Sequence, residues 1–206
     1  MRSAALALAV LAAPLTAQGP QPPQPVLASG ESLEVIVRAD FNADGRADLA
    51  YVAAGEERRE LRVVTTYRNQ FEVGENIPQV LALDAYHLAP AELTAKGNVL
   101  VLRDLTGGTT AVASTHRFRW DAKMSAMRLI GLDATLYSRT FAHDGREASW
   151  NLLTGALVTR TLKLNKGSGD QAYDTVAERT SKKPSPPLPL EASPGGDALL
   201  GWPGGK

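Results

Sequence analysis

Cysteine is absent from this chain of 206 residues, and so is an excess of charge of either sign. Without cysteine no disulfide can form, so the stability of the fold must come from its core or from a bound ion. Lysine and arginine together number 22, and aspartate and glutamate together also number 22. This balance provides no overall field for nucleic acid or for an anionic membrane surface, so neither is expected as a partner.

Long apolar runs are missing as well. The run AALALAVLAA, from Ala4 to Ala13, is about half of the roughly 20 residues needed to cross a bilayer. It follows Arg2 and precedes PLTAQ, a pattern typical of a secretory signal with a small-residue cleavage site. We therefore expect residues 1–17 to be a signal peptide, cleaved after Ala17, and the mature protein to be periplasmic or extracellular, without a transmembrane segment. The alternative is an N-terminal membrane anchor.

Two proline-rich segments border the centre of the chain. The first, QGPQPPQPVLA at residues 18–28, is typical of an extended linker. The second begins at residue 178, and its proline, glycine and few apolar residues predict a disordered tail over 178–206. Within that tail, PSPPLP is also a candidate ligand for a module that binds polyproline. The folded domain is expected over residues 29–177.

The central part alternates apolar and polar residues with the period of β-strands. The expected strands cover residues 33–39, 48–54, 61–68, 98–105, 110–121 and 127–134, and a hairpin covers 149–164 with its turn at Thr154 and Gly155. Residues 77–93 could hold one short helix, confined by Pro78 and Pro90. Because the connections are too short for helical crossovers, we expect a mainly β fold of antiparallel sheets, either sandwich-like or an open barrel.

One loop carries a clear chemical pattern. DFNADGRAD, at residues 40–48, places carboxylate or amide oxygens at positions one, three, five and nine, and Gly45 at position six allows a sharp turn. Hard oxygen donors in this order suit calcium, and suit magnesium less because magnesium demands tighter octahedral geometry. The predicted ligands, including one backbone carbonyl at position seven, are Asp40, Asn42, Asp44, Arg46 and Asp48.

The loop is not an EF-hand, because the acid needed at position twelve is replaced by Tyr51 and both flanks are strand-like. The run from Asp40 to Val52 instead resembles the D-x-N-x-D-G-x-x-D-hydrophobic signature of FG-GAP and VCBS-type repeats. In that family, calcium loops join β-strands in integrin-like propellers and in many secreted bacterial proteins. Only one copy is present, since AHDGREAS at residues 142–149 shares just two positions with it. The resemblance therefore implies a calcium loop on a β-hairpin, and not a propeller.

A second similarity involves THRFRW, MRLIGLDA and SWNLLTG in the C-terminal half. These stretches are similar to the C-terminal part of small, uncharacterised exported bacterial proteins that carry one such loop, a similarity that implies no activity. The 40–48 loop also has a metal-free interpretation, in which Asp40, Asn42 and Asp44 hydrogen-bond to their own backbone in a polar turn. Three carboxylates in one short loop would repel one another without a cation, which favours a structural calcium ion.

Other candidate sites are weaker. His87, His116 and His143 lack the spacing of a zinc site. The strip RFRW at 117–120 could bind an acidic or sugar ligand, although a strand with one exposed face explains it more simply. NKGSGDQ at 165–171 lacks the ending of a phosphate loop and is expected to be a flexible connection. No nucleophile-elbow motif marks a serine hydrolase, and no catalytic residue is assigned.

Two functional hypotheses follow. The favoured one is an exported, noncatalytic β-domain, stabilised in part by calcium, that binds an unknown protein or an envelope glycan. The alternative is an exported hydrolase whose active site is assembled from distant residues, with carboxylates of the 40–48 loop among them. The hypotheses differ in geometry: the loop side chains should converge on an ion in the first, and should open into a substrate cleft in the second.

Overall fold

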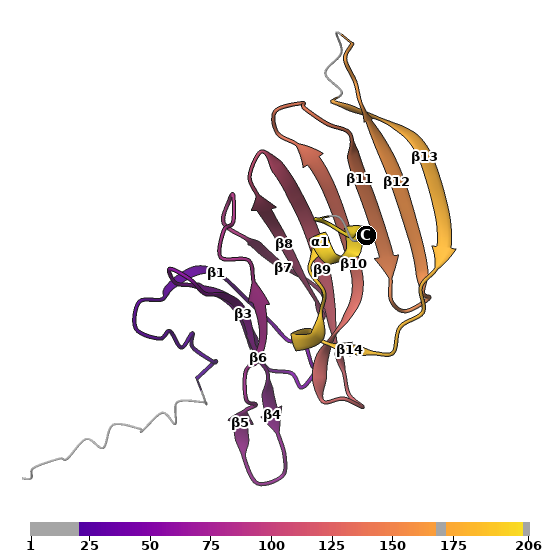
Figure 1. The fold of residues 1–206 in the computed structure, drawn as a ribbon. Helices are drawn as coiled ribbons and strands as arrows, with labels where there is room; N and C mark the ends of the chain where they lie inside the picture. The colour runs from indigo at the N-terminus through magenta and orange to yellow at the C-terminus, as the bar shows by residue number, and fades with distance from the viewer. Residues whose placement is uncertain (1–20, 168–171, 204–206) are drawn as a thin grey trace, which may run out of the picture.

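The structure is a computed structural model that describes residues 21–167 and 172–203. It is mainly β, and every strand pairing in it is antiparallel, as the short connections predicted. Two open sheets and a small ribbon account for the strands (Figure 1). The predicted signal peptide, and the first residues of the predicted linker, lie outside the described part.

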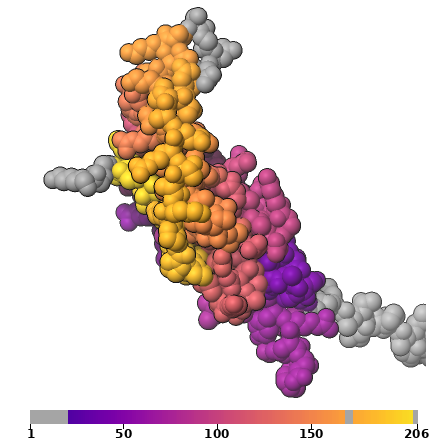
Figure 2. Space-filling model, turned by 90° about the vertical axis from the view of Figure 1, so that its right-hand side faces the viewer, coloured from indigo at the N-terminus to yellow at the C-terminus, as the bar shows by residue number. Residues whose placement is uncertain are grey.

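The smaller sheet has four strands in the order β1–β2–β3–β6. Their bounds are β1 (Ser32–Ala39), β2 (Asp48–Ala54), β3 (Arg59–Val64) and β6 (Gln79–Leu83). Between β3 and β6 the chain forms the ribbon of β4 (Thr66–Arg68) and β5 (Val73–Glu75), which projects from one end of the molecule (Figures 1 and 2).

The larger sheet follows the order β13–β12–β11–β10–β9–β8–β7, and β14 also pairs with β10. Its strands are β7 (Glu92–Lys96), β8 (Val99–Gly107), β9 (Thr110–Asp121), β10 (Ala126–Ser138), β11 (Gly145–Asn151), β12 (Ala156–Leu164), β13 (Tyr173–Lys182) and β14 (Leu188–Pro189). Successive strands are joined directly, so the sheet is an up-and-down meander from β7 to β13.

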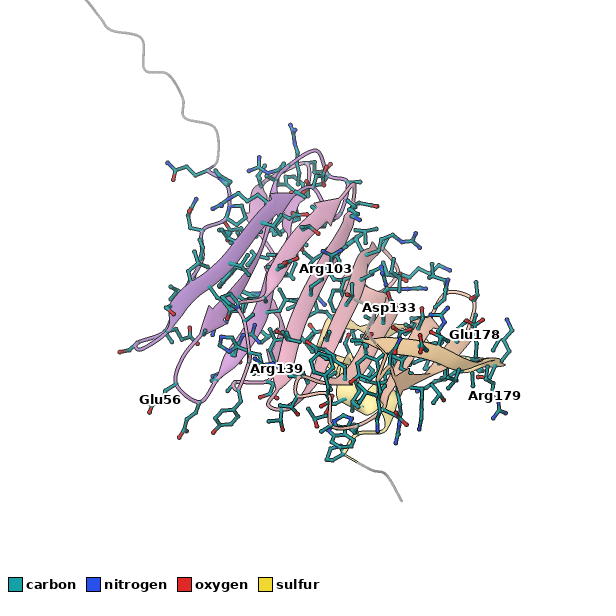
Figure 3. The ribbon with its side chains drawn as sticks, turned by 90° about the horizontal axis from the view of Figure 1, so that it is seen from above. Glu56, Arg103, Asp133, Arg139, Glu178 and Arg179 are labelled. Atoms are coloured by element: carbon teal, nitrogen blue, oxygen red, sulfur yellow. The ribbon has the colours of Figure 1, made fainter. Side chains whose placement is uncertain are left out.

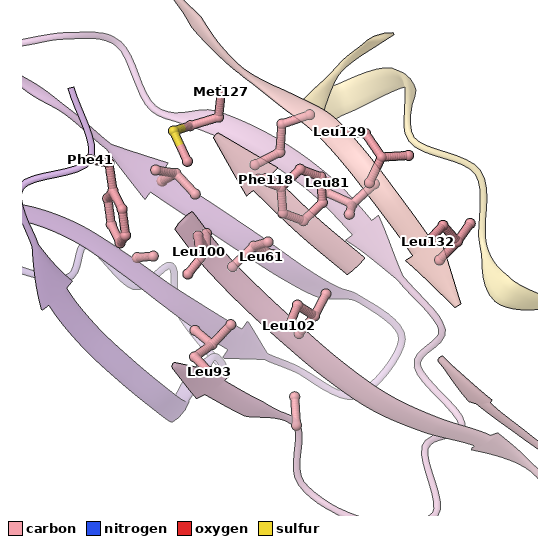
Figure 4. Close-up of a cluster of buried hydrophobic side chains, with 14 of the residues drawn as sticks. Phe41, Leu61, Leu81, Leu93, Leu100, Leu102, Phe118, Met127, Leu129 and Leu132 are labelled. Atoms are coloured by element: carbon pink, nitrogen blue, oxygen red, sulfur yellow. The ribbon is translucent and has the colours of Figure 1, made fainter. Parts of the chain in front are cut away.

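The core lies between the two sheets, as Figure 4 shows. The smaller sheet and its loops supply Phe41, Leu61 and Leu81, and the larger sheet supplies Leu100 and Phe118, all of them buried. Side chains alternate across a strand, so each buried residue is flanked by neighbours that point outward. This alternation is the pattern from which the strands were predicted, and it produces a sandwich-like packing of the smaller sheet on part of the larger one.

The extended N-terminal segment, residues 21–28, packs on the outer face of the smaller sheet. Pro23 is buried, and its carbonyl accepts a hydrogen bond of 3.2 Å from the Arg38 guanidinium. The backbone of Val26 exchanges hydrogen bonds of 3.1 and 3.2 Å with the hydroxyl of Tyr51, a β2 residue that is 1% exposed. Residues 21–28 form no helix or strand, and these contacts attach them to the domain.

The C-terminal part differs from the prediction of a disordered tail over 178–206. β13 continues to Lys182, and η1 (Leu190–Ala192) and α1 (Gly196–Leu200) follow β14. Figure 1 shows this part crossing the larger sheet on the side that faces the smaller one. Its apolar residues are few, but Leu190 is completely buried, and Leu188 and Leu199 pack against the core. The composition-based prediction failed because it weighed the number of apolar residues, whereas their placement on an existing sheet determines the burial.

The possible helix within residues 77–93 is also wrong. That range contains β6 and the start of β7, and α1 is far away in the sequence. In QVLAL the buried Leu81 is opposite Leu61 of β3, and this cross-strand pair decides the conformation. The segment 165–171 lies partly outside the described residues. No helix in the described ranges is long and apolar enough to cross a membrane.

Candidate functional site

The 40–48 loop joins β1 to β2 in an antiparallel hairpin, with Ala39 paired to Asp48. Its turn uses the left-handed conformation at Ala43, with φ of 62°, and at Gly45, with φ of 83°. Glycine adopts that conformation without the steric cost that a side chain brings. The loop is therefore where the sequence placed it, on a β-hairpin between two strands.

The first three acidic or amide side chains turn back onto the loop backbone. Asp40 accepts hydrogen bonds from the N–H groups of Asp44, at 3.1 Å, and of Gly45, at 2.9 Å. The amide oxygen of Asn42 shares the Asp44 N–H at 3.1 Å, and Asp44 accepts one from Arg46 at 2.9 Å. These are Asx-type bonds, so the loop holds its own conformation through its side chains.

Asp48 is the most deeply buried member, with no exposed surface. Its Oδ2 accepts the N–H groups of Phe41 at 2.7 Å and Asn42 at 3.3 Å. Its Oδ1 accepts the N–H and the hydroxyl of Thr66, at 2.7 and 3.0 Å. Burial raises the pKa of Asp48, and the four hydrogen bonds oppose that rise because they favour the charged carboxylate.

Thr66 is a partner that the sequence did not reveal. Besides its two bonds to Asp48, its hydroxyl lies 3.0 Å from Asp44 Oδ2, and its carbonyl accepts the Asn42 side-chain N–H at 2.6 Å. Thr66 begins β4, so these bonds fasten the hairpin loop to the point where β3 gives way to the projecting ribbon. Its role depends on pairing between strands that are distant in sequence, which no local motif encodes.

The loop side chains gather at two points. Asp40 and Asn42 meet at the Asp44 N–H, whereas Asp44 and Asp48 meet at the Thr66 hydroxyl. Every carboxylate oxygen of the three aspartates accepts a hydrogen bond, and across the described ranges no three or more histidine, aspartate and glutamate side chains are placed to hold a metal ion. The carboxylate oxygens of Asp40 and Asp44 each keep a second lone pair that could face calcium, whereas each oxygen of Asp48 already accepts two hydrogen bonds. A calcium site at Asp40, Asn42, Asp44, Arg46 and Asp48 remains a prediction.

None of the loop carboxylates lines the hollow between β6, the larger sheet and residues 193–197. That hollow is a cavity of about 420 Å³ with three walls. One wall is the end of β6 at residues 81–84, the second is formed by β8 and β9, and the third is formed by residues 193–197 and 202–203. Residues 188–203 are called the C-terminal segment below. The cavity exists because this segment, predicted to be disordered, lies across the larger sheet.

A buried ionic cluster lies against the β8 wall. Arg59, 1% exposed, donates to Glu34 at 2.7 and 2.8 Å and to both oxygens of Asp104 at 2.9 and 3.2 Å. Burial alone would raise the pKa of Glu34, but hydrogen bonds from Arg59 and from the Ala91 N–H outweigh it, and the pKa is lowered. Burial likewise works against the charge of Arg59, but its two carboxylate partners raise its pKa above the ordinary value. Glu34 and Arg59 are therefore charged at neutral pH.

His116 lies on the β9 wall and is 4% exposed. Its Nε2 is 2.9 Å from the carbonyl of Pro194, so Nε2 must carry the hydrogen, and its ring stacks on Phe118 with centroids 5.9 Å apart. Burial lowers the pKa of His116, which keeps the imidazole neutral at pH 7. Nδ1 is then an acceptor, and it is buried without a hydrogen-bond partner in the described structure.

The other sequence candidates divide between the two faces of β9. His116 and Phe118 point into the molecule, whereas Arg117 points outward and forms a 2.7 Å ion pair with Asp133 (Figure 3 labels Asp133). The strip at 117–120 is therefore split by the strand alternation, which agrees with the simpler interpretation. The remaining histidines lie apart: His143 is 2.8 Å from the Thr110 hydroxyl, and His87 contacts the Ala85 carbonyl.

No protein-family model matches this chain, and neither the curated proteins nor the solved structures contain a match.

Proposed function

We propose that the protein is an exported, noncatalytic β-domain that binds a ligand in the cavity, with calcium as a structural ion in the 40–48 loop. The cavity is the observation that carries this proposal. Its volume of about 420 Å³ lies within the range of small-ligand sites. Apolar side chains such as Leu81 and Val112 line it together with polar side chains that include Asp104, Ser114 and His116.

The polar groups of the cavity favour binding over hydrolysis. Ser114 and His116 lie two residues apart on β9, and Asp104 is directly opposite Ser114 on β8. A serine hydrolase needs the hydroxyl to hydrogen-bond to the imidazole and the imidazole to a carboxylate. Here the Nε2–H of His116 is used by the Pro194 carbonyl, an arrangement that positions the C-terminal segment. These observations support a binding site more than an active site.

The proposed calcium would be held by the oxygens of Asp40, Asn42, Asp44 and Asp48, with the carbonyl of Arg46. Its charge would offset the repulsion among three carboxylates and would strengthen the link between the β1–β2 hairpin and Thr66. Its role is structural, because the cavity lining includes no residue of the loop.

Screening the purified full-length chain against cationic, neutral and acidic small molecules by NMR tests the binding role. We expect ligands to shift the indole signal of Trp202, which lines the cavity, and to leave Trp120 unchanged. The same samples are assayed with ester, glycoside and phosphodiester substrates. Turnover that is lost in Ser114→Ala and kept in the remote Ser181→Ala would overturn the proposal in favour of the hydrolase.

Export is tested separately. We expect the exported protein to begin at Gln18, which N-terminal sequencing of periplasmic and medium fractions measures. A chain that keeps Met1 and sediments with membranes would show that residues 1–17 act as an anchor.

A further inference from the structure

The charged residues that line the cavity are all acidic. They are Asp104 on the buried wall and Asp84 and Asp197 at the exposed rim, and none of the described lining residues is lysine or arginine. Three carboxylates around one hollow create a negative potential there, which the low-dielectric walls concentrate. An anionic ligand would be repelled from such a cavity.

The buried cluster behind the β8 wall, to which Asp104 belongs, does not neutralise this negative charge. Arg59 is the partner of both Glu34 and Asp104, so one positive charge faces two negative charges. The cluster therefore keeps a net charge of one negative unit. Asp104 is the member of the cluster that lines the cavity, and a carboxylate that accepts two hydrogen bonds from Arg59 still has lone pairs for further donors.

His116 offers a second acceptor in the same wall. Its Nδ1 is buried without a hydrogen-bond partner in the described structure, and a ligand N–H that reached it would satisfy an acceptor whose burial otherwise costs free energy. A neutral imidazole with its hydrogen on Nε2 cannot donate from Nδ1. The hydroxyl groups of Thr106, Thr110 and Ser114 lie in the same lining and can act as acceptors.

Trp202 completes the site from the C-terminal segment. It is 39% exposed and lines the cavity beside Pro203, so part of its ring is open to solvent. The face of an indole ring attracts ammonium and guanidinium groups. An aromatic ring at the rim, acceptors in the wall and acidic groups on three sides all favour one kind of ligand.

We propose that this cavity binds an organic cation, a protonated primary amine or a guanidinium group, through Asp104, His116, the rim carboxylates Asp84 and Asp197, and Trp202. The proposal rests on the proposed binding function and names its ligand class. The cation can come from a free small amine or from a lysine or arginine side chain of another protein. Both sources present several N–H donors and one positive charge, which is the complement of this lining.

Isothermal titration of the purified full-length chain at low ionic strength tests the ligand class. The probes are butylammonium and agmatine as free cations, the capped tripeptides Gly-Lys-Gly and Gly-Arg-Gly as side-chain sources, and butanol and butyrate as neutral and anionic counterparts. We expect the cations to bind, more weakly as salt is added, and the butanol and butyrate not to bind. Tighter binding of the peptides than of the free amines would assign the ligand to a protein partner, and the reverse would assign it to a small metabolite.

Variants locate the binding. Asp84→Asn combined with Asp197→Asn should weaken cation binding about tenfold, because two rim charges are lost while the core is untouched. Asp174→Asn combined with Glu178→Gln removes the same charge from the remote edge strand β13 and should leave the affinity unchanged (Figure 3). Trp202→Leu should weaken the binding of the cations and should leave the result with butanol unchanged.

Three results would overturn this inference. If butanol binds in the cavity as well as the cations do, the ligand class is wrong and the binding function stands. If both pairs of variants weaken cation binding equally, the cations respond to the net charge of the chain and not to the cavity. Absence of any binding in all arms, together with an unshifted Trp202 signal, would overturn the inference and the binding function together.

Discussion

The 40–48 loop and the cavity are both built around carboxylates, but the two regions use them differently. In the loop, all six carboxylate oxygens accept hydrogen bonds from the loop itself and from Thr66. In the cavity, Asp84 and Asp197 are exposed at the rim, and His116 keeps an unpartnered Nδ1. Acidic residues that are close in sequence can accept hydrogen bonds from one another's backbone N–H groups. Acidic residues that the fold brings together from distant parts of the chain leave room for a ligand.

The largest expected effect concerns the ionic cluster behind the cavity. Arg59→Met leaves Glu34 and Asp104 buried without their cation, and removing one member of a buried ion pair costs about 3–5 kcal/mol. Urea denaturation should show this loss in the free energy of unfolding. Arg103→Met is the control, because Arg103 is 60% exposed in its single ion pair and the expected loss is at most about 1 kcal/mol (Figure 3). Equal losses in the two variants would mean that the cluster does not stabilise the fold.

A smaller effect is expected from Gly196→Ala in α1. A Cβ at this position would lie 2.7 Å from the Ser114 Cβ and 3.2 Å from the Ala134 Cβ, so the C-terminal segment would have to move away from the sheet. Such overpacking costs about 1–3 kcal/mol. Denaturation and limited proteolysis after residue 188 should both register the change. Gly108→Ala, where the added methyl meets nothing within 4 Å, should leave both unchanged.

The calcium prediction has a still smaller expected effect. Calcium at about ten times its dissociation constant would stabilise the fold by about 1.4 kcal/mol. In a domain of this size the melting temperature would rise by about 2–4 °C. Calorimetry with calcium and with a chelator measures the rise, and magnesium should produce less of it. Asp44→Ala should abolish most of the response, and Asp174→Ala on β13 should keep it. A melting temperature that does not change up to about 10 mM calcium would leave the loop as a polar turn without metal.

The smallest effect is expected at Glu31, an acidic residue outside both regions. Hydrogen bonds from Arg62 and from the Ala28 N–H, with the charge of Arg62, lower the pKa of Glu31 from 4.5 to about 2. A lowered pKa in the folded state means that this stabilisation is complete above pH 4.5 and is lost as the pH falls towards 2. NMR titration of the Glu31 carboxyl measures the pKa. Glu31→Gln should reduce the dependence of the melting temperature on pH between pH 4.5 and 2. Glu56→Gln, in an exposed loop, should leave that dependence unchanged (Figure 3).

The sequence predicted those parts of the fold in which local alternation agrees with tertiary packing. The expected strands at 48–54 and 110–121 are β2 and β9 with the same bounds, and the 40–48 loop joins two strands as predicted. Thr66 escaped prediction because its contacts with the loop depend on the arrival of β3 beside β2. The cavity could not be predicted for the same reason. Asp84, Asp104 and Asp197 are far apart in the sequence, and no motif links them.

The C-terminal segment, which begins with β14, follows all the other strands of both sheets along the chain. During synthesis the sheets can therefore form before the third wall of the cavity exists. Until Pro194 reaches His116, the Nε2–H of the imidazole lacks its carbonyl partner, and the cavity lacks its third wall. A ligand that contacts both the sheet and Trp202 would stabilise the docked C-terminal segment. Ligand affinity and the docking equilibrium of this segment are therefore thermodynamically linked.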